Sequence, residues 1–379
     1  MQDLTALSKK TCNRLIIKIG SALLVHPETG DLNHDWLATL AADIHDLHQK
    51  GIDIILVSSG SIALGRKDLG LTARPTRLED AQAAAAVGQG RLAQAYADHF
   101  TKFQITTAQI LLSLGDLENR RRYLNARGTL ETLINHRIIP IINENDTVAT
   151  SEIRFGDNDR LAARVGSLTK ADLVILLSDI DGLYTENPKT NPDAQFIAQV
   201  DDITPDIEKM AGPVEAVKGG VGTGGMTSKI MAAKLATSAG CSLAVVQGHH
   251  PHPISHMLNT GRGTLFPAKD SPLAVRKQWL SSLQNPAGFL HIDAGAAKAL
   301  QSGGSLLPVG VTSVDGGFDR GDLVAIFDPD GHLIAQGLVN FTLLEADKIK
   351  GHTSDTIADI IGYSGRTALV HRDDMVLFQ

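Results

Sequence analysis

The first apolar run of the chain reads Leu15-Ile-Ile-Lys18-Ile-Gly20-Ser21. An almost continuous run of Leu and Ile predicts a strand that is buried on both faces, as strands of parallel sheets are. Residues 33–50 then repeat apolar side chains at i, i+3 and i+4 and end at Gly51, which predicts an amphipathic helix. A buried strand followed by a helix indicates the α/β class.

The same alternation continues for about 250 residues. Further strands are predicted at residues 52–57, 104–112, 138–142, 173–177 and 242–247, and further helices at 79–99, 116–136 and 226–240. Because each strand is apolar throughout, the sheet should be covered on both sides. We therefore expect an α/β domain with a mostly parallel sheet sandwiched by helices.

The last hundred residues follow a different pattern. Short alternating strands are separated by turns such as Asp315-Gly316-Gly317 and Asp328-Pro-Asp-Gly331. A chain of 379 residues is also too long for one ordinary core. We expect the sheet domain at residues 1–270, a linker at 271–283 and a small C-terminal β-rich domain at 284–379.

Composition limits the classes of partner. The chain has 35 basic and 42 acidic residues, a net charge of -7, and residues 284–379 carry 6 basic and 12 acidic residues. Such a balance argues against a protein that coats nucleic acid or an anionic membrane. Only two cysteines occur, Cys12 and Cys241, and no segment is apolar enough to span a bilayer, so a cytoplasmic location is expected.

Two glycine-containing turns and a glycine loop suggest phosphate binding. Gly220-Val-Gly222-Thr-Gly224-Gly225 matches the spacing of a dinucleotide fingerprint, but no strand precedes it, and no Gly-Lys-Ser/Thr closes it as a P-loop. It does precede the predicted helix that carries Lys229, where free amides suit a polyphosphate. The alternative is a flexible surface loop.

The other two turns follow predicted strands, at Lys18-Ile-Gly20-Ser21 and at Ser58-Ser59-Gly60-Ser61. Ligands of open α/β sheets gather at the carboxyl ends of the strands, so the three glycine sites should face one crevice. A lysine inside a buried strand requires an anionic partner unless it reaches solvent at the strand end.

Polar clusters occupy three further strand ends or helix starts. They are Asn143-Glu144-Asn145-Asp146, Gly156-Asp157-Asn158-Asp159, and Ser178-Asp179 with Asp181-Gly182. Taken alone, the first two could equally be a plain turn or a helix N-cap.

Taken together, these motifs resemble a known family. The set, in chain order, is Ile17-Lys18-Ile19-Gly20-Ser21, Ser58-Ser59-Gly60, Asn143-Glu144-Asn145-Asp146, Gly156-Asp157-Asn158-Asp159, Asp181-Gly182-Leu183-Tyr184-Thr185 and Gly222-Thr223-Gly224-Gly225-Met226-Thr227-Ser228-Lys229. It closely resembles the glutamate 5-kinase branch of the amino acid kinase family, and the tail resembles a PUA domain. The resemblance covers nearly the whole chain.

The resemblance implies ATP-dependent phosphorylation of the γ-carboxylate of L-glutamate, the first step of proline biosynthesis, with proline as an inhibitor and a homo-oligomeric assembly. The catalytic residues it implies are Lys18, Lys229 and Asp159, with Asp159 holding both lysines. Those implied for ATP are Lys18, Gly20, Ser21, Ser178, Asp179, Thr223, Gly224, Gly225, Met226, Thr227, Ser228 and Lys229. Those implied for glutamate are Ser59, Asp146 and Asn158. Mg²⁺ is expected on the ATP phosphates, with no metal held by the protein itself.

Two other functions stay open at this stage. One is a sibling kinase of the same fold that acts on another carboxylate, a carbamate or a nucleotide. The other is an RNA-binding or regulatory protein, because PUA domains elsewhere bind RNA. The presence of both lysines and Asp159 argues for an enzyme, and the acidity of the tail argues against nucleic acid.

Overall fold

The computed structural model describes residues 12–26, 28–71, 75–148, 158–188, 190–211, 225–363 and 366–378. The chain divides into two compact units, Met1–Pro272 and Leu273–Gln379.

A seven-stranded sheet forms the centre of the first unit. Its strands are β1 (Arg14–Ile19), β2 (Asp53–Ser58), β3 (Thr107–Leu112), β4 (Ile139–Glu144), β5 (Leu173–Ser178), β8 (Ser242–Gln247) and β9 (Thr264–Phe266), in the order β3-β4-β2-β1-β5-β8-β9. All neighbours pair in parallel except β8 and β9, which are antiparallel. Ile17 lies between Leu56 and Ile175, so β1 is central.

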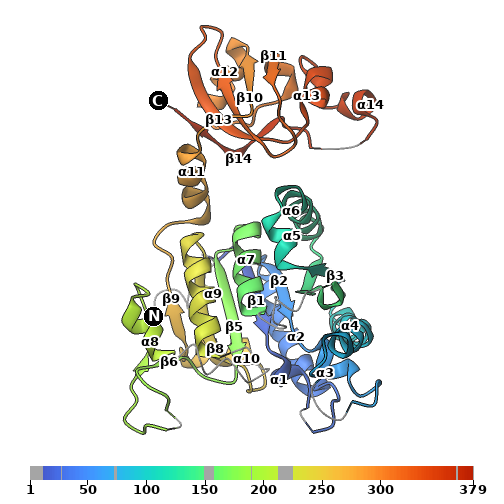
Figure 1. Ribbon diagram of the computed structural model, residues 1–379, viewed down its shortest axis with the longest axis vertical. Helices are drawn as coiled ribbons and strands as arrows, with labels where there is room; N and C mark the ends of the chain where they lie inside the picture. The colour runs from blue at the N-terminus through green and yellow to red at the C-terminus, as the bar shows by residue number, and fades with distance from the viewer. Residues whose placement is uncertain are drawn as a thin grey trace. The chain divides into compact units, whose positions relative to one another are not determined.

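Helices cover both faces of this sheet. Figure 1 shows two of them, α7 and α9, beside β5 on one face. One face packs against α2 (His34–Gln49), α4 (Leu78–Thr101) and α10 (Pro253–Thr260), the other against α6 (Arg120–Asn135), α7 (Asn158–Thr169) and α9 (Met226–Ser238). Alternate residues of one strand serve the two cores: Ile17 belongs to the first and Ile16 to the second. The expected α/β sandwich is confirmed.

Short elements occupy the ends of the strands. They are α1 (Ser21–Leu24), α3 (Ser61–Gly65), α5 (Leu114–Glu118), the 3₁₀ turn η2 (Asp146–Val148), the strands β6 (Leu183–Tyr184) and β7 (Phe196–Ile197), and α8 (Pro205–Met210). The chain thus turns directly from β1, β2 and β4 into a helical turn at one edge of the sheet.

Three predicted boundaries differ from the structure. The helix predicted at residues 116–136 is two helices, because the Asn119 side chain accepts the amide of Arg122 and so caps the start of α6. The strand predicted at 104–112 begins only at Thr107, since Gln104 has a φ of 60°. The strand predicted at 138–142 continues to Glu144 and pairs there with β3.

The second unit is built on a five-stranded sheet in the order β11-β10-β12-β13-β14. Its strands are β10 (Gly288–Ile292), β11 (Val311–Gly316), β12 (Leu323–Phe327), β13 (Leu333–Val339) and β14 (Val370–Leu377), and its helices are α12 (Ala294–Gln301), η4 (Pro308–Gly310), α13 (Leu343–Ile349) and α14 (Ile357–Ile361). Leu290, Ile326 and Phe341 are fully buried in its core. This is the small β-rich domain that the sequence predicts.

Residues that the sequence predicts as a linker form helix α11 (Pro272–Ser282). Leu280 packs against Leu323 and Leu338 of the second unit. Arg276 makes a largely buried ion pair with Asp374 at 3.0 Å. Since α11 shares a core and an ion pair with the second unit, it is part of that unit's fold.

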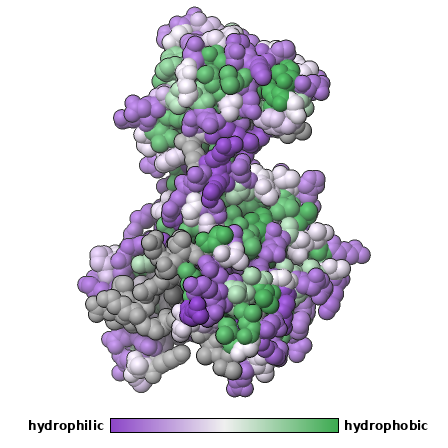
Figure 2. Space-filling model, turned by 45° about the vertical axis from the view of Figure 1, so that its right-hand side comes forward, coloured by the Kyte–Doolittle hydropathy of each residue, from purple (hydrophilic) through white to green (hydrophobic). Residues whose placement is uncertain are grey.

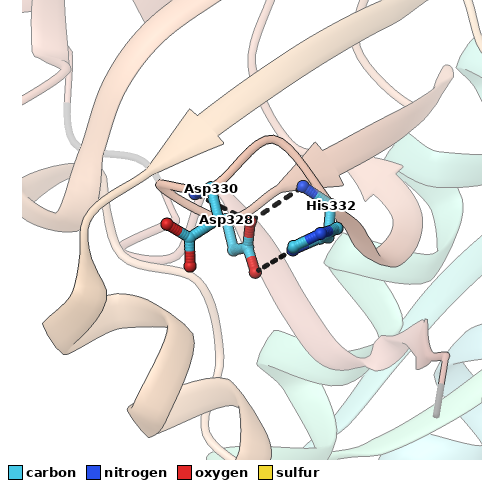
Figure 3. A group of neighbouring side chains, drawn as sticks. All are labelled: Asp328, Asp330 and His332. Carbon is cyan, nitrogen blue, oxygen red and sulfur yellow. Dashed lines mark hydrogen bonds and ion pairs between the residues drawn. The ribbon is translucent and has the colours of Figure 1, made fainter.

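Asp328, Asp330 and His332 lie together in the turn between β12 and β13 (Figure 3). Asp328 Oδ1 accepts the backbone amides of Asp330 at 3.0 Å and His332 at 2.8 Å, and its Oδ2 contacts His332 Nδ1 at 3.5 Å. The His332 amide is the largest cause that lowers the pKa of Asp328. These contacts account for the cluster as the internal bonding of a tight turn.

Hydrophobic and hydrophilic residues are mixed on the part of the surface that Figure 2 presents. Figure 2 shows separate hydrophobic patches set among hydrophilic residues on the face that it presents. Within the described ranges, no helix has both the length and the apolar character that crossing a membrane requires.

Candidate active site

A pocket of about 1190 Å³ lies at the carboxyl ends of the parallel strands. Its lining includes Lys18, Gly20, Ser21, Ser59, Gly60, Ser61, Asn143, Asp146, Asn158, Ser178, Asp179, Asp181, Gly225, Met226 and Lys229. These residues come from the last residues of β1, β4 and β5, from the turns after β1, β2, β4 and β5, and from the starts of α7 and α9. Strand ends as far apart in the sequence as Ile19 and Ser178 therefore surround one space.

The turn after β2 needs a glycine. Gly60 has a φ of 111°, a conformation that L side chains rarely adopt. It precedes α3 and leads the chain from β2 into that helix within two residues. Ser59 and Ser61 thereby both reach the pocket.

Three charged side chains meet beside the pocket. Lys18 Nζ lies 2.6 Å from Asp159 Oδ1, and Lys229 Nζ lies 3.0 Å from Asp159 Oδ2. The side chains are only 8%, 2% and 3% exposed for Lys18, Asp159 and Lys229. Two cations therefore share the Asp159 carboxylate beside the pocket.

Each of the three comes from a different element. Lys18 is on β1, Asp159 is in the first turn of α7, and Lys229 is in the first turns of α9. Burial raises the pKa of Asp159, but Lys18 and Lys229 together lower it by more than burial raises it. The pKa of Asp159 is therefore below the ordinary value. Asp159 is therefore an ionised carboxylate that holds both ammonium groups in place.

The polar end of the pocket is lined by Ser59, Ser61, Asn143, Asp146 and Asn158. Asn158 Nδ2 donates to Ser59 Oγ at 2.7 Å and to Asn143 Oδ1 at 3.1 Å. Ser61 Oγ donates to Asp146 Oδ2 at 3.1 Å. Asn143, Asp146 and Asn158 are each less than 9% exposed. This cluster offers one acidic group and several neutral partners to a small polar ligand.

Asp146 has a perturbed acidity. Burial raises the pKa of its carboxyl to about 6, and the hydrogen bond from Ser61 offsets part of that effect. A cationic ligand group would favour the ionised form. Asp146 is thus poised to pair with an ammonium group.

The remaining wall is formed after β5. Ser178 Oγ donates to Asp179 Oδ1 at 3.1 Å. Arg262 donates to Asp181 at 2.8 Å and to the Tyr184 hydroxyl at 2.9 Å, and the hydroxyl in turn donates to Asp181. These bonds tie the turn after β5 to the loop before β9.

Comparison with known proteins identifies the fold. The model of the amino acid kinase family matches residues 13–247, and the model of the PUA domain matches residues 288–361. The chain belongs to the amino acid kinase family. Among curated relatives, the glutamate 5-kinase of Dinoroseobacter shibae is 52% identical over 374 residues, which cover 99% of this chain and 100% of the relative.

A second relative, the glutamate 5-kinase of Brucella anthropi, is 52% identical over 368 residues, or 97% of this chain and 96% of the relative. Among solved structures, carbamate kinase from Giardia lamblia bound to AMP-PNP is 15% identical, with a TM-score of 0.48 over 68% of this chain and 99% of that one.

Most site residues expected from the sequence of this amino acid kinase lie around the pocket. Asp159 lies behind the lining and contacts Lys18 and Lys229. Thr227 and Ser228 are in the first turn of α9 but do not line the pocket; Thr227 instead donates to the backbone of Ala211. The expected nucleotide residues Thr223 and Gly224 lie outside the described residues.

Sequence reasoning about the kinase assigned no role to three polar residues. Ser61 and Asn143 belong to the polar motifs that follow two predicted strands. Their closeness in sequence to Ser59 and Asp146 indicates that they could reach the same pocket. Gln89 lies on the alanine-rich helix α4 and carries no such signal, yet it is buried and bonded to Asn143 at 2.7 Å.

Proposed function

We propose that this chain transfers the γ-phosphoryl group of ATP to the γ-carboxylate of L-glutamate, giving glutamyl 5-phosphate and ADP at the first step of proline biosynthesis. The family and the near full-length similarity to glutamate 5-kinases support it. The observation that carries it is the arrangement of Lys18 and Lys229 around Asp159 beside a pocket that Asp146 also lines.

The chemistry requires charge stabilisation more than proton transfer. A γ-carboxylate oxygen of glutamate bonds to the γ-phosphorus, and the bond from that phosphorus to the bridging oxygen breaks with its electrons leaving on ADP. No general base is needed, because a carboxylate is already ionised at neutral pH. Lys18 and Lys229 would stabilise the negative charge that spreads over the transferred group and the leaving oxygen.

Two sets of pocket residues would position the substrates. Gly20, Ser21, Ser178, Asp179, Gly225 and Met226, which line the pocket around the lysines, would contact ATP together with the glycine loop at 223–224. Ser59, Asp146 and Asn158 would hold glutamate, with the Asp146 carboxylate on the substrate ammonium.

Magnesium would be held by ATP rather than by the charged centre. Both oxygens of Asp159 contact lysine ammonium groups, which already compensate its negative charge. Mg²⁺ usually keeps several waters and binds substrate phosphates. When bound in this way it supplies positive charge that neutralises the phosphate oxygens. Asp179 and Asp181, at the pocket wall, could accept hydrogen bonds from its waters.

Proline would act as an inhibitor, since it shares an ammonium and a carboxylate on one carbon with glutamate and could pair with Asp146. We also expect the enzyme to be a homo-oligomer. Inhibition by proline that is relieved by added glutamate in a steady-state assay would support the shared site.

The direct test is an ATP-consumption assay with glutamate, aspartate, N-acetylglutamate, carbamate and UMP. Glutamate alone should be a good substrate, because N-acetylglutamate lacks the ammonium that Asp146 would bind. Preference for carbamate or UMP would favour a sibling kinase, and no turnover with any acceptor would favour a regulatory protein.

A variant at Asp146 tests the glutamate site separately from the ATP site. Asp146→Ala should raise the KM for glutamate by roughly tenfold or more, as expected for a lost charge-assisted bond, and leave the KM for ATP nearly unchanged. Equal changes in both constants, or equal use of N-acetylglutamate by the natural chain, would contradict the role of Asp146.

A further inference from the structure

Helices α3 and α4 approach each other unusually closely beneath the pocket. A Cβ atom on Gly65 of α3 would lie 1.9 Å from the carbonyl oxygen of Ala84, and one on Gly88 of α4 would lie 1.8 Å from that of Ser61. No real side chain tolerates such distances, so both positions require glycine. The contact places residue 89, the next residue of α4, beside the polar end of the pocket.

Gln89 occupies that place and is buried, at 8% exposure. Its Oε1 accepts a hydrogen bond of 2.7 Å from Asn143 Nδ2. Gln89 does not itself line the pocket, whereas Asn143 does. It therefore lies directly behind a pocket residue, where its contact with a substrate can only be indirect.

Two groups determine which atom donates in the hydrogen bonds around Asn143: the backbone amide of Glu144 and the carboxylate of Asp146. Asn143 Oδ1 accepts the backbone amide of Glu144 at 2.9 Å, and a backbone amide can only donate. The Nδ2 group of Asn143 must therefore point away, toward Gln89 and toward Ser61 Oγ at 3.3 Å. At the other end, ionised Asp146 can only accept, so Ser61 donates to it.

One amide thus orients both arms of the polar cluster. Through Nδ2, Asn143 orients Ser61 toward Asp146; through Oδ1, it accepts from Asn158, whose Nδ2 also reaches Ser59. If the Asn143 amide were rotated by half a turn, its oxygen would face the oxygens of Gln89 and Ser61. Its NH₂ group would then face the NH₂ group of Asn158, which is also a donor. The acceptor that Gln89 supplies disfavours that rotation.

We propose that Gln89 is a positioning residue for the acceptor substrate: it holds the Asn143 amide in the orientation that sets Ser59, Ser61, Asp146 and Asn158 for binding. This inference rests on the proposed function, because it takes the polar end of the pocket as the glutamate site. Its effect should be confined to glutamate, since the network is centred on Asn143, whereas Lys18 and Lys229 are held by Asp159.

The test compares Gln89→Met, which keeps the length of the side chain and removes the acceptor, with Gln89→Glu. A buried Glu, neutral through its raised pKa, still offers a carbonyl oxygen to Asn143. The matched control is Gln94→Met, the same substitution at an exposed position of α4 whose side chain donates to Asp98. Steady-state constants for both substrates and the melting temperature are measured for the full chain.

Gln89→Met should raise the KM for glutamate roughly tenfold, the factor that one ordinary hydrogen bond is worth. Its KM for ATP should change by less than twofold, Gln89→Glu should recover most of the glutamate affinity, and Gln94→Met should match the natural chain. If Gln89→Met does not fold, Gln89→Ala serves in its place. Water can fill the space that the shorter side chain leaves, but it cannot hold the Asn143 amide in one orientation.

Three results would overturn the inference: an unchanged KM for glutamate in Gln89→Met, a parallel rise of both KM values with a lower melting temperature, or no recovery in Gln89→Glu. The proposed function fails separately, if the natural chain itself does not phosphorylate glutamate. Activity of the natural chain on glutamate together with any of the three results would leave the proposed function intact.

Discussion

Asp159 makes the burial of two lysines tolerable at the centre of the kinase domain. An isolated buried charge is costly, whereas Lys18 and Lys229 each lie within 3.0 Å of its carboxylate. Both ammonium groups also line the pocket, where they would attract an incoming phosphate.

Removal of either lysine should therefore affect turnover more than folding. In Lys18→Ala and Lys229→Ala we expect kcat to fall by about 100-fold or more, or about 2.7 kcal/mol, which is typical for loss of one stabilising group of the transition state. The fold should survive, since Asp159 keeps the other lysine. Circular dichroism and steady-state kinetics measure the two effects.

Lys234→Ala is the control for this prediction. Lys234 lies on the same helix as Lys229, but its ion pair with Glu208 is at the surface, with side chains 47% and 44% exposed. Surface pairs contribute little, so its kcat should stay within about twofold of the natural value. Near-normal turnover in a folded Lys18 or Lys229 variant would remove these residues from the catalytic centre.

The acidity of Asp146 predicts a pH dependence of stability. Burial raises the pKa in the folded state from the ordinary 3.8 to about 6, so folding opposes ionisation of this group. Its favourable contribution is complete below about 3.8, declines as the pH rises toward 6, and is absent above that value. Asp146→Asn should consequently be more stable than the natural chain above pH 6, by no more than about 3 kcal/mol.

Urea denaturation of both proteins between pH 4 and 8 measures this difference. The advantage of Asp146→Asn should grow over the window between the two pKa values and then level off, because Asn keeps an oxygen for Ser61 and has no proton to lose. A constant difference across the whole range, or a natural chain that is more stable at high pH, would show that Asp146 does not titrate in this way.

At the scale of single residues, the sequence predicted those polar groups that follow an apolar strand directly. Lys18, Ser59, Asp146 and Ser178 all stand within four residues of such a strand end, where a parallel sheet presents its ligands. Gln89 was not predictable in this way. Its place depends on the approach of α4 to α3, and only the folded chain brings these helices together.

At the scale of elements, the same helix pair determines how the polar end of the pocket is assembled. Gly88 allows α4 to touch the backbone of Ser61, whose hydroxyl binds Asp146. Gly88→Ala should force these backbones apart and destabilise the protein by about 1–3 kcal/mol or more, as overpacking commonly does. The displaced Ser61 should also raise the KM for glutamate.

Gly90→Ala gives the matched comparison two residues along α4. A Cβ atom there would meet nothing within 4 Å, so alanine should stabilise the helix by up to about 1 kcal/mol through its higher helix propensity. Chemical denaturation of the two variants and the natural chain measures the change in the free energy of unfolding at each position. Similar effects at both positions would mean that the glycines act through propensity alone and that the helix contact is loose.

Element types were more predictable than their ends. Continuous apolar runs identified β1, β2, β4, β5 and β8, since burial on both faces leaves a strong signal. The break at Asn119 and the helix α11 gave weaker signals. In the sequence, nothing distinguishes Asn119, whose side chain caps α6, from other polar residues. Helix α11 lacks a regular apolar pattern because Leu280 is its one buried side chain, so its sequence resembles a linker.

At the scale of the whole molecule, charge is divided unevenly between the two units. Residues 284–379 carry 6 basic and 12 acidic residues, which accounts for most of the net charge of -7. The region contains the segment that matches the PUA domain. Several of its cations are already engaged: Lys350 pairs with Asp347 at 2.5 Å, and Arg366 donates to Asn340 at 2.8 Å.

We therefore expect the protein to bind RNA more weakly than roughly 10 μM at physiological salt, although it carries this domain. Affinity for nucleic acid depends largely on Lys and Arg that neutralise phosphates, and here acidic residues outnumber basic ones twofold. The measurement is a titration of the full chain with labelled tRNA and mixed single strands at about 0.15 M salt. The double substitution Asp347→Lys and Asp373→Lys releases Lys350 and Arg372 from acidic neighbours, and it should gain binding that weakens as salt is added. Micromolar binding by the natural chain with a steep salt dependence would instead show that a local basic surface outweighs the average charge.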